Sequence, residues 1–313
     1  MFLIGSKAWE LRQGASLGRE ATDLDIICSQ DEFYTLVQRL NFPPFTIESI
    51  KIDKEHGVIK VFDRTDPTKN KLIIEAAFTN VAGKLTESNK VLVDKTFPLL
   101  FYLKAIDSFV VPASLHALYA LKQTHKFKGS VHFQKTRKDI LAMREALKNI
   151  PAPVWIKKWQ IERAKATAVQ APILKQNKDS FFSDNVDYLY NHDTIHDAVK
   201  HLDQPAYCYY AQDGEEVLSS KQKFFAQSEE VRLLGVLEES YVLALERAVI
   251  PHQVQPKKAF DKALEKVCTT ITSGFFREYA WENYDRIQAL YSESYVNKFY
   301  IALKQGRIEK YKR

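Results

Sequence analysis

Cysteine is scarce in this chain of 313 residues. Its three cysteines lie far apart, in no spacing that is typical of metal ligands: Cys28, Cys208 and Cys268. That scarcity argues against a disulfide framework and against a structural zinc site. It is typical of proteins in a reducing compartment, and we expect a cytoplasmic location.

Long apolar runs are also missing, and none reaches the length that crosses a membrane. The opening Met-Phe-Leu-Ile-Gly-Ser-Lys is too short for the apolar region of a signal peptide. Apolar residues make up 45% of the chain and charged residues 27%, which is ordinary for a soluble globular protein. We therefore expect a soluble protein with no membrane partner; the pattern leaves its oligomeric state open.

Two carboxylates stand at the start of an apolar run. Asp23 and Asp25 are separated by one residue, so on a strand they lie on the same face, roughly 7 Å apart along the chain. Two acids this close repel each other unless a cation lies between them, and Mg²⁺ with nucleotide phosphates suits such a pair. Upstream, Gly5 and Ser6 end a short apolar run, where backbone amides at a helix start would face the phosphates.

These elements resemble the DNA polymerase β-like nucleotidyltransferase superfamily, in which Gly-Ser is followed by Asp-apolar-Asp and by a third carboxylate on a later strand. Glu75, inside the apolar run from Lys71 to Phe78, matches the third carboxylate. The resemblance covers roughly residues 1–80. It implies that Asp23 and Asp25 hold two Mg²⁺ ions and that Glu75 completes one metal site and accepts a proton from the acceptor hydroxyl. Gly5 and Ser6 would then hold the phosphates of an NTP.

Members of this superfamily often pack a helical domain against the catalytic sheet, with lysines or other polar residues reaching the triphosphate. By that resemblance, we predict that Lys122, His125 and Lys135 contribute to nucleotide binding. Lys122 and His125 are three residues apart and share a helix face if the helix extends past Gln123. The alternative interpretation is a basic helix face that only contacts solvent.

The predicted activity is metal-dependent transfer of a nucleoside monophosphate from an NTP to an acceptor hydroxyl. The formal charge of +6 and several basic clusters favour RNA, including tRNA, as the acceptor. Two alternatives remain: a protein-modifying nucleotidyltransferase of the toxin or antitoxin kind, and a non-catalytic nucleic-acid-binding factor with a vestigial domain. Most of the chain is also similar to uncharacterised nucleotidyltransferase-like proteins of large tailed phages, which would place it in the host cytoplasm.

The predicted fold class is α+β, with a mixed N-terminal sheet followed by a large, mostly α-helical region. We predict a catalytic domain over residues 1–82, a helical domain packing on the catalytic site over 83–165, and a C-terminal helical domain over 166–313. The pattern predicts strands over residues 2–4, 23–28, 45–52, 57–62 and 71–78. It predicts helices over residues 7–13, 32–40, 97–106, 113–123, 133–147, 154–164 and 229–249.

Two further patterns occur in the C-terminal part. His192 and His196 share a helix face, as do Glu239 and Glu246, so facing helices could hold a second metal site. The alternative is that these residues form structural hydrogen bonds and ion pairs, and we favour this alternative. The aromatic run from residue 269 to 284 could stack bases, but its helical spacing favours a core.

Overall fold

The computed structural model describes residues 1–18, 21, 23–63, 72–80, 84–95, 98–127, 132–168, 220–229, 232–233, 235–237, 240, 256–270 and 274–291. The chain divides into two compact units. The first comprises Met1–Lys126 and Gln134–Ala171, and the second comprises Phe127–Phe133 and Pro172–Arg313. The predicted domain boundaries at residues 82 and 165 stay predictions.

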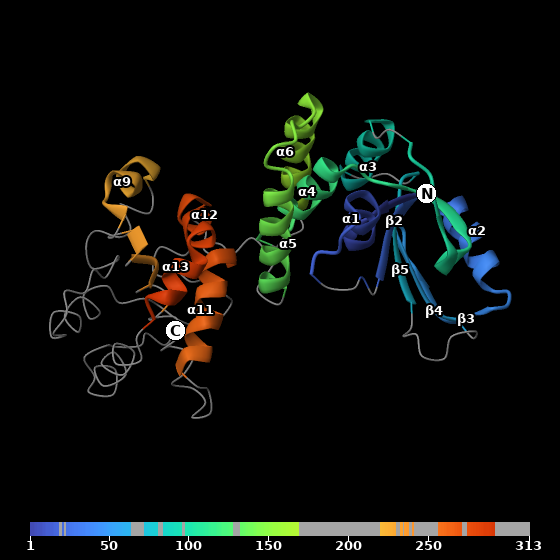
Figure 1. Ribbon diagram of the computed structural model, residues 1–313, viewed down its shortest axis with the longest axis horizontal. Helices are drawn as coiled ribbons and strands as arrows, with labels where there is room; N and C mark the ends of the chain where they lie inside the picture. The colour runs from blue at the N-terminus through green and yellow to red at the C-terminus, as the bar shows by residue number, and fades with distance from the viewer. Residues whose placement is uncertain are drawn as a thin grey trace. The chain divides into compact units, whose positions relative to one another are not determined.

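The first unit is built on a mixed sheet of seven strands in the order β3-β4-β5-β2-β1-β7-β6 (Figure 1). Strand β2 lies parallel to β5 and antiparallel to β1, while β1 is parallel to β7. The strands are β1 (Phe2–Ile4), β2 (Asp23–Cys28), β3 (Phe45–Ile52), β4 (His56–Asp63), β5 (Leu72–Phe78), β6 (Phe101–Leu103) and β7 (Ser108–Pro112).

Helix α2 (Gln30–Leu40) covers one face of the sheet, and α1 (Gly5–Gln13) lies on the other (Figure 1). The α2 face carries the buried side chains of the central strands, such as Leu24, Ile26 and Ile74. Phe33 of α2 packs edge to face on Phe78, with ring centroids 5.4 Å apart. Alternation along each strand therefore sends the remaining side chains to the α1 face.

Four more helices complete the first unit: α3 (Lys84–Lys95), α4 (Leu115–Thr124), α5 (Phe133–Ala146) and α6 (Val154–Ala168). Ser114 caps α4 through a hydrogen bond from the Ala117 amide to its hydroxyl. Trp159 of α6 is buried and donates its indole N–H to the Ser88 carbonyl on α3, at 2.8 Å. Apolar packing and this buried hydrogen bond hold α3 and α6 together.

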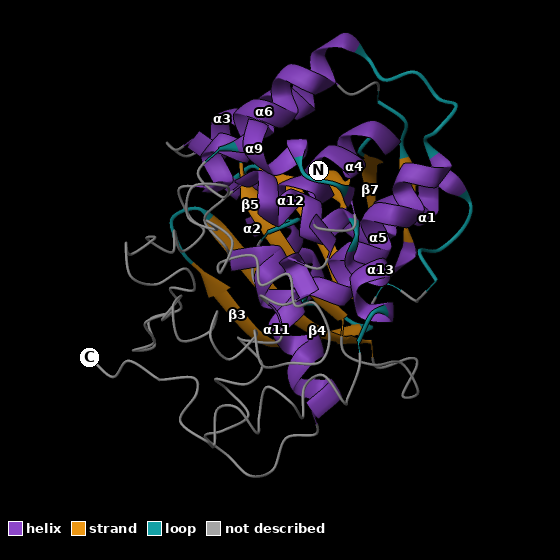
Figure 2. Cartoon of the chain, turned by 90° about the vertical axis from the view of Figure 1, so that its left-hand side faces the viewer, coloured by secondary structure: helices purple, strands orange, loops and turns teal. Residues whose placement is uncertain are grey.

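The second unit contains α9 (Lys221–Ala226), α11 (Pro256–Thr270), α12 (Gly274–Glu282) and α13 (Tyr284–Ala289), shown as helices in Figure 2. The aromatic side chains here form a core, with Phe276 and Trp281 fully buried and Tyr284 nearly so. Arg277 stacks on the Phe127 ring at 4.2 Å, and burial lowers the pKa of its guanidinium. These contacts favour a core over a base-stacking platform.

The α+β class is confirmed, and most elements of the first unit agree with prediction within a few residues. The helix predicted over residues 97–106 is wrong, because β6 and a short 3₁₀ turn (Lys104–Ile106) occupy the described part of this region. Strand β7, which follows it, was not predicted. Ser29 caps α2 in a reciprocal pair with Glu32.

Within the described part of the chain, no helix combines the length and the apolar character that crossing a membrane requires. Most of the helix predicted over residues 229–249 lies outside the described residues.

Candidate functional site: three carboxylates beside the start of helix α1

The three predicted carboxylates come from two adjacent strands at the centre of the sheet. Asp25 on β2 is the direct register partner of Glu75 on β5, and Asp23 stands two residues earlier on β2, opposite Ile73. Paired residues of parallel strands lie on the same face, and so do residues two apart on one strand. The structure thus places Asp23, Asp25 and Glu75 on one face, the face of α1. Asp23 and Asp25 are half-buried, and Glu75 is exposed.

Gly5 brings the start of α1 against Asp25. Ile4 pairs with Asp25 across β1 and β2, and the chain turns into α1 at Gly5, which has a left-handed backbone with φ of +72°. A Cβ built on Gly5 would lie only 2.0 Å from the Asp25 Oδ2 atom. A residue without a side chain is therefore needed for two reasons: the backbone conformation and the space that the Asp25 carboxylate occupies.

The surroundings of Asp25 raise the pKa of its carboxyl group. Burial and the nearby negative charges of Asp23 and Glu75 raise its pKa from 3.8 to about 6, whereas Lys122 and Lys135 act in the opposite direction. At neutral pH the carboxylate is charged at a free-energy cost, since its own neighbours repel it. A cation at this point would relieve that repulsion.

Two predicted lysines approach this face from the helices. Lys122, near the end of α4, forms an ion pair with Asp139 of α5, with 2.6 Å between Nζ and Oδ2. Lys135 is exposed in the first turn of α5. Both are close enough to Asp25 to lower its pKa. The structure therefore brings Lys122 and Lys135 into the electrostatic surroundings of the carboxylates.

The other predicted nucleotide-binding residues lie at element boundaries. Ser6 is half-buried in the first turn of α1, directly after Gly5. His125 follows the last residue of α4 rather than continuing that helix, and its backbone N–H is hydrogen-bonded to the Lys122 carbonyl at 3.0 Å.

Asp139 was not predicted from the sequence. Only 2% of its side chain is exposed, although it is charged. The signal was present, because Asp139 lies beside Ile140 and four residues before Met143, on the buried stripe of α5. An acid on an apolar helix stripe predicts a buried partner, and here that partner is Lys122.

Among the described residues, no group of three or more His, Cys, Asp or Glu side chains is arranged to hold a metal ion by itself. The three carboxylates share a face and repel each other, but their side chains do not converge on a single point. Mg²⁺ commonly takes only one or two protein carboxylates and completes its shell with water and phosphate oxygens. The suggested second site with His192, His196, Glu239 and Glu246 lies outside the described residues.

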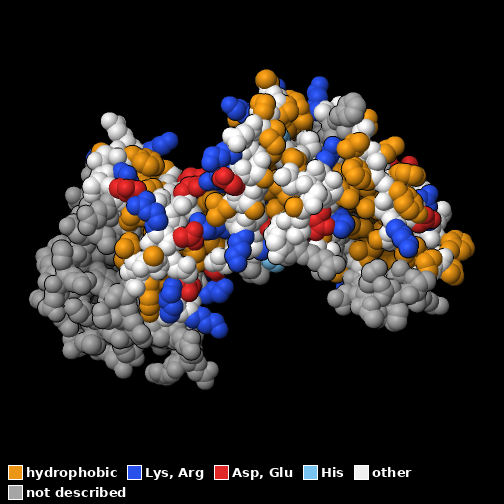
Figure 3. All heavy atoms as spheres, in the orientation of Figure 1, with side chains coloured by type: hydrophobic (Ala, Val, Ile, Leu, Met, Phe, Trp, Pro, Cys, Tyr) orange, Lys and Arg blue, Asp and Glu red, His pale blue; other side chains and the backbone are white. Residues whose placement is uncertain are grey.

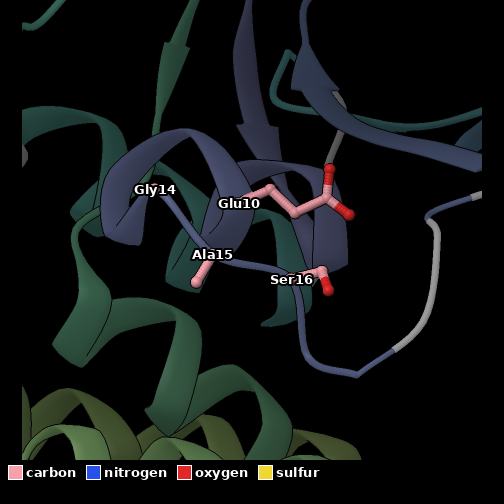
Figure 4. A pocket seen from close by; sticks show the side chains of 4 residues that line it. All are labelled: Glu10, Gly14, Ala15 and Ser16. Carbon is pink, nitrogen blue, oxygen red and sulfur yellow. The ribbon is translucent and has the colours of Figure 1, made fainter.

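A surface pocket of about 380 Å³ lies elsewhere on α1 (Figure 4). Glu10 in the last turn of the helix and the residues Gly14, Ala15 and Ser16 that follow the helix line it. Glu10 is already paired with Lys7, at 2.7 Å. None of the predicted site residues lines this pocket, so it adds nothing to the carboxylate site.

Comparison with known proteins assigns a family to the helical part. A family model described as a domain of unknown function, DUF7275, matches residues 117–301, which is more than half of the chain. The chain therefore belongs to the DUF7275 family. The matched residues include Lys122, Lys135 and Asp139. The three carboxylates precede the matched range in the sequence and lie outside it.

No curated protein matches the chain. Among solved structures, one from H. pylori that is provisionally described as a nucleotidyltransferase is similar, with a TM-score of 0.26 and 13% sequence identity. The similarity covers 56% of this chain and 90% of that chain.

Two glycines with the same backbone conformation test the contact between Gly5 and Asp25. Gly5 and Gly14 have φ of +72° and +71°, but only Gly5 of this pair has an atom within 4 Å of a built Cβ. We expect Gly14→Ala to cost about 1 kcal/mol of unfolding free energy from backbone strain, and Gly5→Ala to cost about 1–3 kcal/mol because the Asp25 carboxylate must also move. Urea denaturation of both variants measures the difference. Equal losses would contradict the close contact.

Proposed function

We propose that the protein is a metal-dependent nucleotidyltransferase that moves a nucleoside monophosphate from an NTP to an acceptor hydroxyl. The observation that carries this proposal is the register pairing of Asp25 with Glu75, with Asp23 on the same face and Gly5 at the start of α1 directly against Asp25. Three acids at this density are unfavourable unless a cation or proton offsets their repulsion, and the raised pKa of Asp25 agrees with that expectation.

The donor set is chemically suited to Mg²⁺, since every side chain in it offers hard carboxylate oxygens. Asp23 and Asp25 would hold two ions, and Glu75 would complete one of the two sites. Bound Mg²⁺ would supply Lewis-acid chemistry, lowering the pKa of the attacking hydroxyl and neutralising charge on the leaving pyrophosphate. The absence of a closed three-ligand group among the described residues is compatible with a site that phosphate oxygens complete.

The protein groups around the carboxylates have separate tasks in this proposal. The amides at the start of α1, around Gly5 and Ser6, would bind phosphate oxygens, as helix N-termini commonly do. Glu75, the exposed acid of the three, would accept the proton of the acceptor hydroxyl. Lys122 and Lys135 would balance the charge of the triphosphate. Because the acceptor oxygen attacks the α-phosphorus directly and pyrophosphate leaves, no covalent enzyme intermediate is required.

We favour RNA, including tRNA, as the acceptor. The exposure of each described lysine decides whether it could contact an RNA phosphate. Lys126, two residues past the end of α4, is only 5% exposed, so it does not offer a surface charge to a polyanion. Lys135 is exposed. On the face drawn in Figure 3, Lys and Arg side chains are interspersed with acidic and apolar ones rather than gathered in one patch.

The salt dependence of RNA binding tests this choice of acceptor. For a single strand, each phosphate contact contributes about −0.7 to the slope of log K against log salt concentration. Lys135→Ala should make the slope shallower by about that amount, while Lys126→Ala should leave it unchanged because the side chain is buried. Fluorescence anisotropy with a labelled single-stranded RNA measures both slopes. No RNA binding at low salt would exclude RNA and leave a protein or metabolite as the acceptor.

The activity itself is tested by incubating the full chain with an NTP labelled on the α-phosphate. Transfer of that label to RNA, dependent on Mg²⁺ and on Asp25, is the expected result. Label that appears on protein instead of RNA would support nucleotide transfer but replace the proposed acceptor. A nucleotide that binds without any transfer would support the non-catalytic alternative.

A further inference from the structure

The ion pair between Lys122 and Asp139 joins two helices, and its lysine acts electrostatically on Asp25. Lys122 belongs to α4 and Asp139 to α5, and their charged atoms are 2.6 Å apart. Exposed fractions are 20% for the Lys122 side chain and 2% for Asp139. A buried pair of this geometry is costly to break from one side, because the remaining charge stays buried and loses the attraction that offset part of its desolvation cost. The position of the Lys122 ammonium is therefore strongly constrained.

Lys135 differs from Lys122 in its surroundings, although both influence Asp25. It lies four residues before Asp139 on α5 and so shares a helix face with it, yet the side chain is exposed. Within the described residues, no ion pair is formed by Lys135. Thus, within the described part of the chain, Lys122 is held by an acid, while Lys135 is exposed and forms no ion pair.

From this difference, we propose that Asp139 is a positioning residue that fixes Lys122 beside the carboxylates, and that Lys135 binds the triphosphate directly. The inference rests on the proposed function, since the ligand is the phosphate chain of the nucleotide. A lysine held in place loses less conformational freedom when phosphate arrives, which favours binding. An exposed lysine that is not held by an acid can instead follow the phosphate chain and release it with the product.

Binding of inorganic triphosphate in the presence of Mg²⁺ tests the inference without assuming a nucleobase. Isothermal titration calorimetry on the full chain should show that Lys135→Ala weakens binding by about tenfold or more, the effect of losing one charge-assisted contact. Asp139→Asn should weaken it by about fivefold, a coupling of ordinary size between neighbouring residues. Lys158→Ala is the matched control, because this lysine of α6 is 84% exposed and its ion pair is with Glu162 on its own helix. It should bind like wild type.

A double-mutant cycle separates positioning from general structural support. In the Lys122→Met background, Asp139→Asn should have less than about a twofold effect, since there is no ammonium left to position. The positioning role is overturned if Asp139→Asn weakens binding equally in wild type and in the Lys122→Met background, or if it binds normally by itself. Asp139→Glu, which keeps the charge, should recover most of the affinity.

Thermal melts restrict these comparisons to folded variants. Lys122→Met with Asp139→Asn removes both charges of this ion pair together, so it should cost less stability than a single change that leaves one of them behind. The two hypotheses fail in different ways. Wild type that does not bind triphosphate with Mg²⁺ overturns the proposed function and the inference together. Wild type that binds, with normal binding by Asp139→Asn, overturns the positioning role alone.

Discussion

Asp25→Asn is expected to lower nucleotide transfer at least about 100-fold, which is the effect of removing one preorganised electrostatic contact in an active site. Asparagine keeps the shape of the side chain but removes the negative charge that would bind Mg²⁺. Asp23→Asn should have a comparable effect, because Asp23 lies on the same strand and the same face. Initial rates of label transfer under saturating NTP and Mg²⁺ measure the loss.

The matched control for these variants is Asp94→Asn on α3, an exposed acid outside the carboxylate face. It should transfer at the wild-type rate. Near-wild-type transfer by both Asp23→Asn and Asp25→Asn would remove these two acids from the active site. Circular dichroism of each variant ensures that a lost rate reflects lost chemistry rather than unfolding.

Asp25→Asn should also stabilise the metal-free protein against unfolding at high pH. In the folded state the pKa of Asp25 is raised from 3.8 to about 6, so the folded protein binds this proton more tightly than the unfolded chain does. Wild type therefore loses stability as the pH rises from about 4 to about 6, and the loss is complete above that range. At about 1.4 kcal/mol per pKa unit, Asp25→Asn should be more stable by about 2–3 kcal/mol at pH 8.

Urea denaturation at pH 4 and pH 8 in the presence of EDTA measures this difference. The advantage of Asp25→Asn should be small at pH 4, where the wild-type carboxylate is largely protonated in the folded state. Adding Mg²⁺ and triphosphate at pH 8 should reverse the order, since the ligand stabilises only a protein that binds it. If Asp25→Asn is less stable than wild type at pH 8 without metal, then the protein groups around Asp25 stabilise its charged carboxylate rather than repel it.

Local patterns were sufficient to predict most of the fold of the first unit. Gly14 marks the end of α1 through its left-handed conformation, and the apolar runs of β2 and β5 are long enough to identify as strands. The region from Leu99 to Pro112 was harder. Strand β7 exists because it pairs with β1, more than a hundred residues earlier in the chain, and no local window contains that partner. Its Val110 and Val111 were the available signal.

In the candidate site, too, sequence neighbours could be placed from their spacing, whereas contacts between distant residues could not. That Asp23 and Asp25 share a face follows from their spacing alone. The partnership of Asp25 with Glu75 depends on the register of β2 against β5, which spacing does not determine. The close approach of Gly5 to Asp25 and the ion pair between Lys122 and Asp139 are likewise tertiary. They could be found only once the strands and helices were placed.

The fate of the nucleotide phosphates is the most direct test of the central claim. Wild-type protein should be incubated with acceptor RNA and Mg²⁺ in parallel reactions, one with an NTP labelled on the α-phosphate and one labelled on the γ-phosphate. Nucleotidyl transfer predicts that α-label becomes attached to the acceptor and that γ-label is released as pyrophosphate, with both events abolished by EDTA. Attachment of γ-label, or release of free phosphate without attachment of α-label, would contradict the account.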